Sequence, residues 1–231
     1  MTTDTLRTLA QVNQAIIACV KCPHLRQYCA LVAQEKRRAF REETYWGKPL
    51  PGFGDPQAQL LIVGLAPAAH GGNRTGRMFT GDRSGDFLYA ALHRAGFASQ
   101  SIAVSRDDGL QLIDAYIAAA GRCAPPDNKP TRAELDNCRP YLIDEVRLLK
   151  NVRVIVALGK IAFDTVFAAL AGRGLEIPRP RPAFGHDVAY ILDRYTVIGS
   201  YHPSQRNTQT GLLTPRMIDR VFARSRRIIS E

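Results

Sequence analysis

No stretch of this 231-residue sequence is apolar for the roughly 20 residues that a membrane-spanning helix requires. Its first residues also lack the basic, apolar and small-residue segments of a secretory signal peptide. We therefore expect an intracellular, cytoplasmic protein with no membrane partner. Internal repeats and low-complexity tracts are absent too, and 45% of the residues are hydrophobic, so we expect one globular domain over residues 1–231.

Acidic side chains are fewer than basic ones. The sequence has 21 Asp and Glu against 31 Lys and Arg, which gives a formal net charge of +10 at pH 7. The excess is spread along the chain rather than gathered in a tail, and it favours a polyanionic partner. Nucleic acid is the commonest such partner, although a basic composition also occurs in proteins that bind none.

Disulfides are rare in a reducing compartment, so the five cysteines need another interpretation. Cys19 and Cys22 form a CxxC pair, whereas Cys123 and Cys138 stand 14 residues apart in a proline-containing stretch. Four thiolates in two pairs suit an iron–sulfur cluster or a structural zinc, and this is favoured over the alternative of four small buried hydrophobes. For the isolated Cys29 we expect the buried hydrophobe. Such a metal site would tie the N-terminal segment to a loop about a hundred residues later.

The periodicity of apolar residues predicts an α/β fold with a central four-stranded, largely parallel sheet flanked by helices. The predicted strands are residues 59–65, 113–120, 152–158 and 195–201. Helical patterns cover residues 84–96, 160–172 and the basic amphipathic stretch 215–229. A capping box is predicted at Thr131 to Glu134, and Pro140 is expected to open a helix that runs to Leu149. Residues 172–182 are expected to form a flexible connection.

In such a sheet, ligands bind beyond the carboxyl ends of the strands. Three segments leave those ends with chemically useful residues: the loop 64–82 after the first strand, residues 121–128 after the second, and "YHPS", residues 201–204, after the fourth. The segment after the third strand begins a helix without a polar cluster and is interpreted as scaffold.

Two familiar phosphate-binding patterns are missing from the loop 64–82, "GLAPAAHGGNRTGRMFTGD". It has neither the Walker GxxxxGK signature nor GxGxxG at the strand exit, so its five glycines are interpreted as admitting a ligand close to the backbone. Phe79, the loop's one aromatic residue, could stack on a planar base or seal the core. Asp82, its one acid, could serve chemistry or simply cap the following helix.

Taken together, the loop 64–82, "RCAPPDNKPT" followed by Cys138, "HPS" and the upstream CxxC resemble the uracil-DNA glycosylase superfamily. The match extends from Cys19 to about Ser204 and is most similar to family 5, the thermophile-type enzymes with an iron–sulfur cluster. The resemblance implies the uracil-DNA glycosylase fold and a 4Fe-4S cluster held by Cys19, Cys22, Cys123 and Cys138, although spacing alone does not choose iron over zinc. It also implies hydrolysis of the bond between a deaminated base and deoxyribose, which initiates base excision repair. The expected partner is DNA containing uracil or other deaminated bases such as hypoxanthine, bound by a monomer, nucleoid-associated if the source is prokaryotic.

The sequence departs from most of the superfamily at the start of its first motif. Leu65 and Ala66 stand where most families place Asp, Asn or Glu to position the attacking water. We therefore assign that role to Asp82 and expect a less discriminating pocket. His202 is assigned as the donor to the departing base. The other residues expected to bind base or DNA are Gly64, Leu65, Ala66, Ala68, His70, Phe79, Asn128, Ser204 and Arg206.

Lysine is absent from all three motif loops, so we expect a monofunctional glycosylase that forms no Schiff base. Residues 204–216 could supply a wedge into the base stack through Leu212 or Leu213, or could be an ordinary loop before the basic helix. Two rival functions stay open: a non-catalytic, iron–sulfur-dependent nucleic-acid-binding protein, and a structural zinc-ribbon module.

Overall fold

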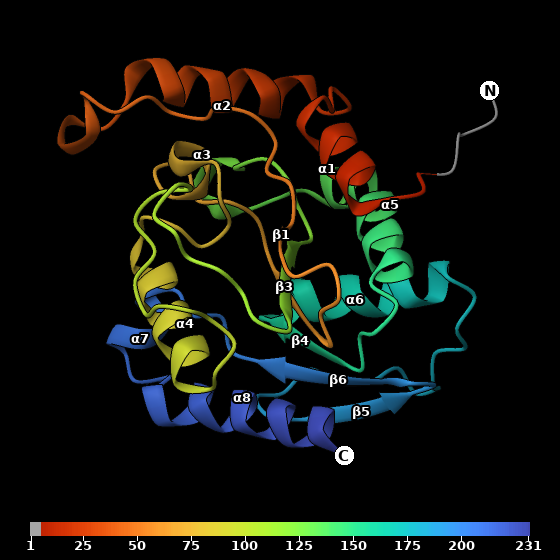
Figure 1. The fold of residues 1–231 in the computed structure, drawn as a ribbon. Helices are drawn as coiled ribbons and strands as arrows, with labels where there is room; N and C mark the ends of the chain where they lie inside the picture. The colour runs from red at the N-terminus through yellow and green to blue at the C-terminus, as the bar shows by residue number, and fades with distance from the viewer. Residues whose placement is uncertain (1–5) are drawn as a thin grey trace.

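The computed structural model describes residues 6–231 and has a six-stranded sheet at its centre (Figure 1). The strand order is β1-β3-β2-β4-β6-β5. The four inner strands are β2 (Leu60–Gly64), β3 (Ala115–Ala119), β4 (Val154–Leu158) and β6 (Tyr195–Ser200), and all of them run parallel. Every residue of β2, β3 and β4 is buried, which explains why these strands read as continuous apolar runs. The predicted α/β fold and its parallel strands are confirmed.

The expected number of four strands is wrong, because each edge of the sheet carries a further antiparallel strand. β1 (Phe53–Gly54) pairs with β3, and β5 (Ala189–Leu192) pairs with β6. β1 has only two residues and so leaves no periodic pattern to detect. β5 is mostly open to solvent, with Ile191 80% exposed, and therefore lacks the apolar signature of a buried strand.

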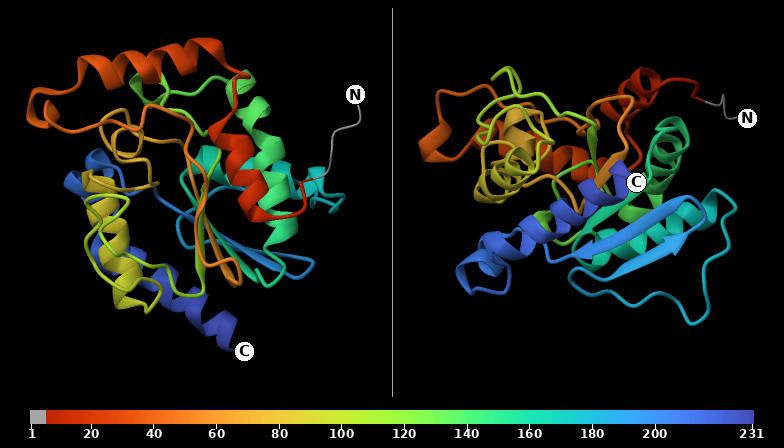
Figure 2. Two further views of the ribbon diagram at one scale, coloured as in Figure 1. Left: turned by 45° about the horizontal axis from the view of Figure 1, so that its top comes forward. Right: turned by 60° about the horizontal axis from the view of Figure 1, so that its bottom comes forward.

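Helices cover both faces of the sheet and bury alternate side chains of each strand. Leu60 and Ile62 of β2 pack in the core beneath α4 (Arg83–Arg94) and α8 (Pro215–Ser230). Leu61 and Val63 face the opposite way, into the core beneath α5 (Arg132–Leu148) and α6 (Lys160–Gly172). Figure 2 shows α4 beside α8 on one side of the sheet, with α5 on the other. Because successive side chains of a strand point to opposite faces of the sheet, one apolar strand contributes residues to both cores.

One predicted helix start is wrong. Thr131, not Pro140, begins α5: its side chain accepts a hydrogen bond from the N–H of Glu134, whose carboxylate accepts one from the N–H of Thr131. Thr131 is thus the N-cap, the first residue within the helix is Arg132, and Pro140 lies inside the helix. Proline within a helix removes one backbone donor, and here the helix continues past it to Leu148.

The N-terminal helix α1 (Leu9–Ile17) packs against α5, whereas α2 (Pro23–Glu35) and the short η1 (Arg38–Phe40) lie outside the two main layers (Figure 1). Three further short helices, α3 (Gly72–Thr75), η2 (Pro126–Asn128) and α7 (Gln205–Gln209), lie in the segments that follow β2, β3 and β6. The predicted connection 172–182 lies between α6 and β5 and contains neither helix nor strand beyond the last residue of α6; its flexibility stays a prediction. Among residues 6–231, no helix combines the length and the apolar character needed to cross a membrane.

Candidate active site

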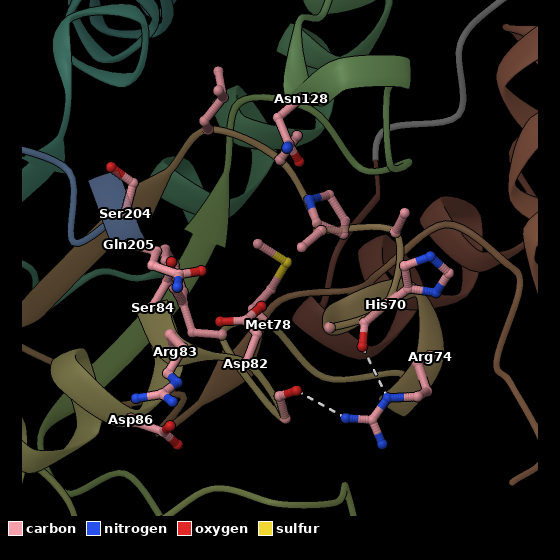
Figure 3. Close-up of a pocket in the computed structure, with 18 of the residues that line it drawn as sticks. His70, Arg74, Met78, Asp82, Arg83, Ser84, Asp86, Asn128, Ser204 and Gln205 are labelled. Carbon is pink, nitrogen blue, oxygen red and sulfur yellow. Dashed lines mark hydrogen bonds between the residues drawn. The ribbon is translucent and has the colours of Figure 1, made fainter. Parts of the chain in front are cut away.

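A cleft of about 1420 Å³ lies beyond the carboxyl ends of the parallel strands. Its lining comes from all three predicted loops and from parts that sequence reasoning did not assign to the site: Tyr28, residues 37–43, the start of α4 at residues 83–86, and residues 103–105. Figure 3 shows Asp82 near the centre of the view, with Ser204 and Gln205 to one side and His70 and Arg74 to the other. The topology therefore brings the loops that follow β2, β3 and β6 to one place.

The first residue of the loop 64–82, Gly64, has to be a glycine for steric reasons. A Cβ on Gly64 would lie 2.7 Å from Cζ of Phe79, so only glycine lets this ring pack against the end of β2. Phe79 has a left-handed backbone, φ 52°, and is 8% exposed. Its ring centroid lies 5.9 Å from that of His202. The ring therefore seals the core, as one of the two alternatives expects, and it also lines the cleft; its stacking on a base stays a prediction.

Asp82 is the N-cap of α4. Its Oδ1 accepts a hydrogen bond of 2.9 Å from the N–H of Gly85, as the capping alternative expects. Its Oδ2 lies against Gly71, so closely that a Cβ there would be 2.0 Å from the oxygen. Burial raises the pKa of Asp82, opposed by hydrogen bonds from the backbone of Gly85 and Ser84. The carboxylate lines the cleft while it caps the helix.

His202 follows the end of β6 and lines the same cleft. The side-chain amide of Asn207 donates to the carbonyl of His202 over 2.9 Å, which fixes the backbone here. Burial lowers the pKa of His202 to about 4. The imidazole is therefore neutral at pH 7 and carries one N–H that it can donate.

His70 is tied to the rest of the protein rather than free in the cleft. Its Nδ1 lies 3.1 Å from the hydroxyl of Tyr45, and its carbonyl accepts a 2.8 Å hydrogen bond from Nε of Arg74. Burial lowers the pKa of His70, and the positive charges of Arg37 and Arg74 lower it further. This ring is also neutral at pH 7.

The remaining predicted residues lie around the cleft with different degrees of exposure. Leu65, Ala66 and Ala68 line its floor and are partly exposed, whereas Gly64 is buried beneath Phe79. Asn128 and Arg206 are exposed and line the cleft. Ser204 caps α7, because its Oγ accepts a 3.3 Å hydrogen bond from the N–H of Asn207.

Of the two leucines considered as a wedge, only one is accessible. Leu212 is 47% exposed, whereas Leu213 is fully buried in the core beneath α4 and α8. Leu213 is therefore not accessible as a wedge, and the possible wedge is limited to Leu212.

Sequence reasoning missed Arg74, although it lies within the first motif. Its side chain is only 7% exposed, and its Nη2 donates to the carbonyl of Gly81 over 2.8 Å. Through these bonds and the one to His70, Arg74 holds together both ends of the loop 70–81. Its sequence neighbours give no sign of burial, so no pattern would have found it.

The four paired cysteines lie near one another where α1 meets α2: Cys19 and Cys22 are in the link between these helices, and Cys138 is on α5. Cys22 and Cys123 share a small buried cluster, and the thiol of Cys138 lies near those of Cys19 and Cys22. The side-chain amide of Asn137 donates to Sγ of Cys22 over 3.4 Å. Within residues 6–231, no three His, Cys, Asp or Glu side chains are arranged to hold a metal ion. Four convergent thiols, three of them buried, are nevertheless the donor type that iron–sulfur clusters and structural zinc require.

Cys29 is fully buried, and its Sγ lies 3.5 Å from the carbonyl of Ala124. It packs in the same small cluster as Cys22 and Cys123. This is the environment expected of a cysteine that acts as a small hydrophobe.

The fold and the cleft define an α/β protein with a candidate ligand site at the carboxyl edge of a parallel sheet, lined by a carboxylate and a neutral imidazole. Residues 51–225 match the family model for the uracil DNA glycosylase superfamily. The chain is 50% identical over 223 residues to the type-5 uracil-DNA glycosylase of Mycobacterium leprae, covering 96% of each chain. It is 48% identical over 217 residues to the type-5 uracil-DNA glycosylase of Thermus thermophilus, covering 93% of this chain and 95% of that one.

A more distant relative is the type-4 uracil-DNA glycosylase of Pyrobaculum aerophilum, which is 32% identical over 166 residues. That match covers 71% of this chain and 67% of the relative. The chain therefore belongs to the uracil DNA glycosylase superfamily and, within it, to the type-5 family.

Proposed function

We propose that this hydrolase is a monofunctional uracil-DNA glycosylase, which cleaves the N-glycosidic bond of uracil in DNA. The observation that carries the proposal is the cleft itself, in which Asp82 and a neutral His202 lie beyond the carboxyl ends of β2 and β6, two parallel strands with β4 between them. Breaking this bond develops positive charge on the sugar and negative charge on the departing base, so an anion and a hydrogen-bond donor are needed.

Asp82 supplies the anion. Its Oδ1 is held by the N–H of Gly85, and its Oδ2 lies beside Gly71, which has no side chain to displace it. A carboxylate placed in this way can orient a water molecule toward the anomeric carbon and stabilise the sugar cation. Asp82 can cap α4 and act on the substrate at the same time, because the cap uses Oδ1 and leaves Oδ2 for the water molecule.

His202 supplies the donor. Because burial lowers its pKa to about 4, the ring is neutral and donates one N–H to the base oxygen as that oxygen gains negative charge. Preorganised donors of this kind act mainly in the transition state and cost no reorganisation when the charge appears. Phe79, 5.9 Å from the His202 ring centre to centre, provides an apolar surface for the flat base.

The range of bases extends beyond uracil in this proposal, to hypoxanthine and other deaminated bases. Leu65 and Ala66 line the cleft and offer no polar side chain that would reject a larger or differently substituted ring. Apolar contacts of this kind discriminate between bases by only a few kcal/mol.

No lysine lines the cleft in the described part of the chain, which supports direct attack by water over an amine nucleophile. The product is then an intact strand with an abasic site. Leu212 is the accessible side chain for filling the space that the extruded nucleotide leaves. We propose that the protein acts in this way as a cytoplasmic monomer on DNA, nucleoid-associated in a prokaryote.

We also propose that Cys19, Cys22, Cys123 and Cys138 hold a 4Fe-4S cluster. The convergence and partial burial of these thiols support a soft-metal site. The cluster, when bound, would link the segment between α1 and α2 to the loop that follows β3 and to α5. These residues thus position the cleft wall rather than take part in base release.

Incubation of the protein with a uracil-containing duplex, followed by mild alkali, tests the proposed activity. We expect strand breaks at the uracil positions and none in the matched thymine duplex, since alkali cleaves only at abasic sites. Binding to DNA without alkali-labile product would instead favour the non-catalytic iron–sulfur protein. Trapping of the protein on DNA by borohydride would contradict the monofunctional mechanism, because it requires a Schiff base.

A further inference from the structure

The segment that follows α2 carries a group of basic residues with no role in the chemistry above. We call residues 36–47, "KRRAFREETYWG", the basic arm. Its side chains Arg37, Arg38 and Arg41 are exposed, and none of the three forms an ion pair within residues 6–231. In Figure 1 the basic arm leaves the far end of α2 and runs back toward α3.

Arg74 fixes the basic arm to the first motif loop. Its guanidinium lies 3.8 Å from the centre of the Phe40 ring and forms an ion pair with Glu43. The same guanidinium donates to the carbonyl of Gly81, next to Asp82. One buried side chain thus connects the basic arm to the residue that precedes the proposed catalytic acid.

A second set of contacts holds the end of the basic arm. The N–H groups of Trp46 and Gly47 donate to the carbonyls of Arg74 and Asn73, over 2.9 and 3.0 Å. The hydroxyl of Tyr45 accepts a 3.3 Å hydrogen bond from the N–H of Arg37 and lies 3.1 Å from Nδ1 of His70. The basic arm and the loop 64–82 therefore form one rigid unit.

The basic arm also lines the cleft, through Arg37, Phe40 and Glu43. Glu43 is neutralised by Arg74, which leaves Glu42 as the arm's one remaining acid against four basic residues. Phe40 is held beneath the Arg74 guanidinium and is not free to stack on a base. The basic arm therefore presents positive charge on the exposed side chains of Arg37, Arg38 and Arg41, which suits the binding of phosphate groups.

We propose that the basic arm binds the sugar-phosphate backbone of the DNA beside the extruded nucleotide, through Arg37, Arg38 and Arg41. The proposal rests on the proposed function, since it takes the cleft as the site of that nucleotide. The contacts are to phosphates, so they set affinity and register without reading sequence. Helix α2 connects Cys22 to the basic arm.

The salt dependence of binding tests the proposal. We would measure the affinity of the Arg38→Gln/Arg41→Gln variant for a duplex with a stable abasic-site analogue, over a range of KCl concentrations. Each lost phosphate contact lowers the slope of log affinity against log salt by about 0.9, so the double variant should lose about 1.8.

The matched control is Arg220→Gln/Arg227→Gln on α8, which removes the same charge from exposed positions on the far side of the molecule from the basic arm (Figure 1). We expect its slope to change by less than half as much. Equal slope changes in the two double variants, or no change in the arm variant, would overturn the proposal. If the double arm variant folds poorly, Arg38→Gln alone decides the question with an expected loss of about 0.9.

This experiment is independent of the proposed activity. Failure of wild-type protein to release uracil would refute the glycosylase, whereas the abasic-analogue titration would still report whether the basic arm contacts DNA. Unaltered salt slopes with normal base release would refute DNA binding by the basic arm, while the proposed glycosylase activity would still hold.

Discussion

Replacing Gly71 by alanine should displace the carboxylate of Asp82 while residue 82 itself stays an aspartate. The new Cβ would lie 2.0 Å from Oδ2 and 2.9 Å from Cγ of Asp82. Ordinary contacts of this kind are 3.4 Å or longer, so the carboxylate or the loop must shift by more than 1 Å. Since Oδ1 is bonded to the N–H of Gly85, the shift also strains the cap of α4.

A displacement of about 1 Å at a group that positions a reactant can reduce a rate by about 100-fold. Loss of an N-cap hydrogen bond costs about 1 kcal/mol, which in a protein of this size lowers Tm by about 2 to 4 °C. We therefore expect Gly71→Ala to release uracil about 100-fold more slowly than wild type, with only a small fall in Tm. The assay is single-turnover release from a uracil-containing duplex with protein in excess.

Gly109→Ala is the matched control. No atom lies within 4 Å of a Cβ at this position, although φ is +80°, so the variant carries backbone strain without displacing Asp82. It should release uracil at the wild-type rate. A wild-type rate for Gly71→Ala with an unchanged Tm would refute the claim that the position of Asp82 Oδ2 matters.

Further predictions concern the donor, the acid dependence and the metal. His202→Ala should slow base release by about 100- to 1,000-fold in single-turnover assays while DNA affinity changes little. Base release should fall with decreasing pH as Asp82 takes up a proton, at a pH above the ordinary value of 3.8 because burial raises its pKa. The pKa of His202 falls from 6.5 to about 4 on folding, so its contribution to stability is complete above pH 6.5 and is lost between pH 6.5 and about 4. That loss amounts to about 3 kcal/mol, and denaturant titrations of His202→Gln should lack it. Anaerobically purified protein should be brown with about four irons per chain, and zinc without iron would contradict the cluster. Cys19→Ala or Cys138→Ala should reduce iron content and folding yield, whereas Cys29→Ala should change neither.

The inner strands and the cleft could be predicted because their causes are local. Strands buried on both faces must be apolar throughout, and loops that follow parallel strands meet at one edge. The edge strands left no such trace, since β1 has two residues and β5 exposes Ile191. The helix start predicted at Pro140 was wrong for a different reason. Proline is common at helix starts, but here the helix begins after the capping box at Thr131 and continues through Pro140.

The contacts that fix the site could not be predicted, because they join residues that no short pattern relates. The fit of Asp82 against Gly71 depends on how the loop 64–82 folds back on itself. The basic arm is bound to that loop through Arg74, whose burial comes from packing between segments about 30 residues apart. Its charged sequence is equally typical of a solvated surface, so only the structure connects it to the cleft.

Single-turnover base release by Asp82→Asn tests the central claim most directly. Asparagine keeps the size of the side chain and an oxygen that can accept the N–H of Gly85, so the cap of α4 survives while the negative charge is lost. The account predicts a rate at least about 100-fold below wild type on a uracil-containing duplex, with an unchanged Tm. Release of uracil at the wild-type rate would contradict it and would move the water-positioning role to His70 or Asn128.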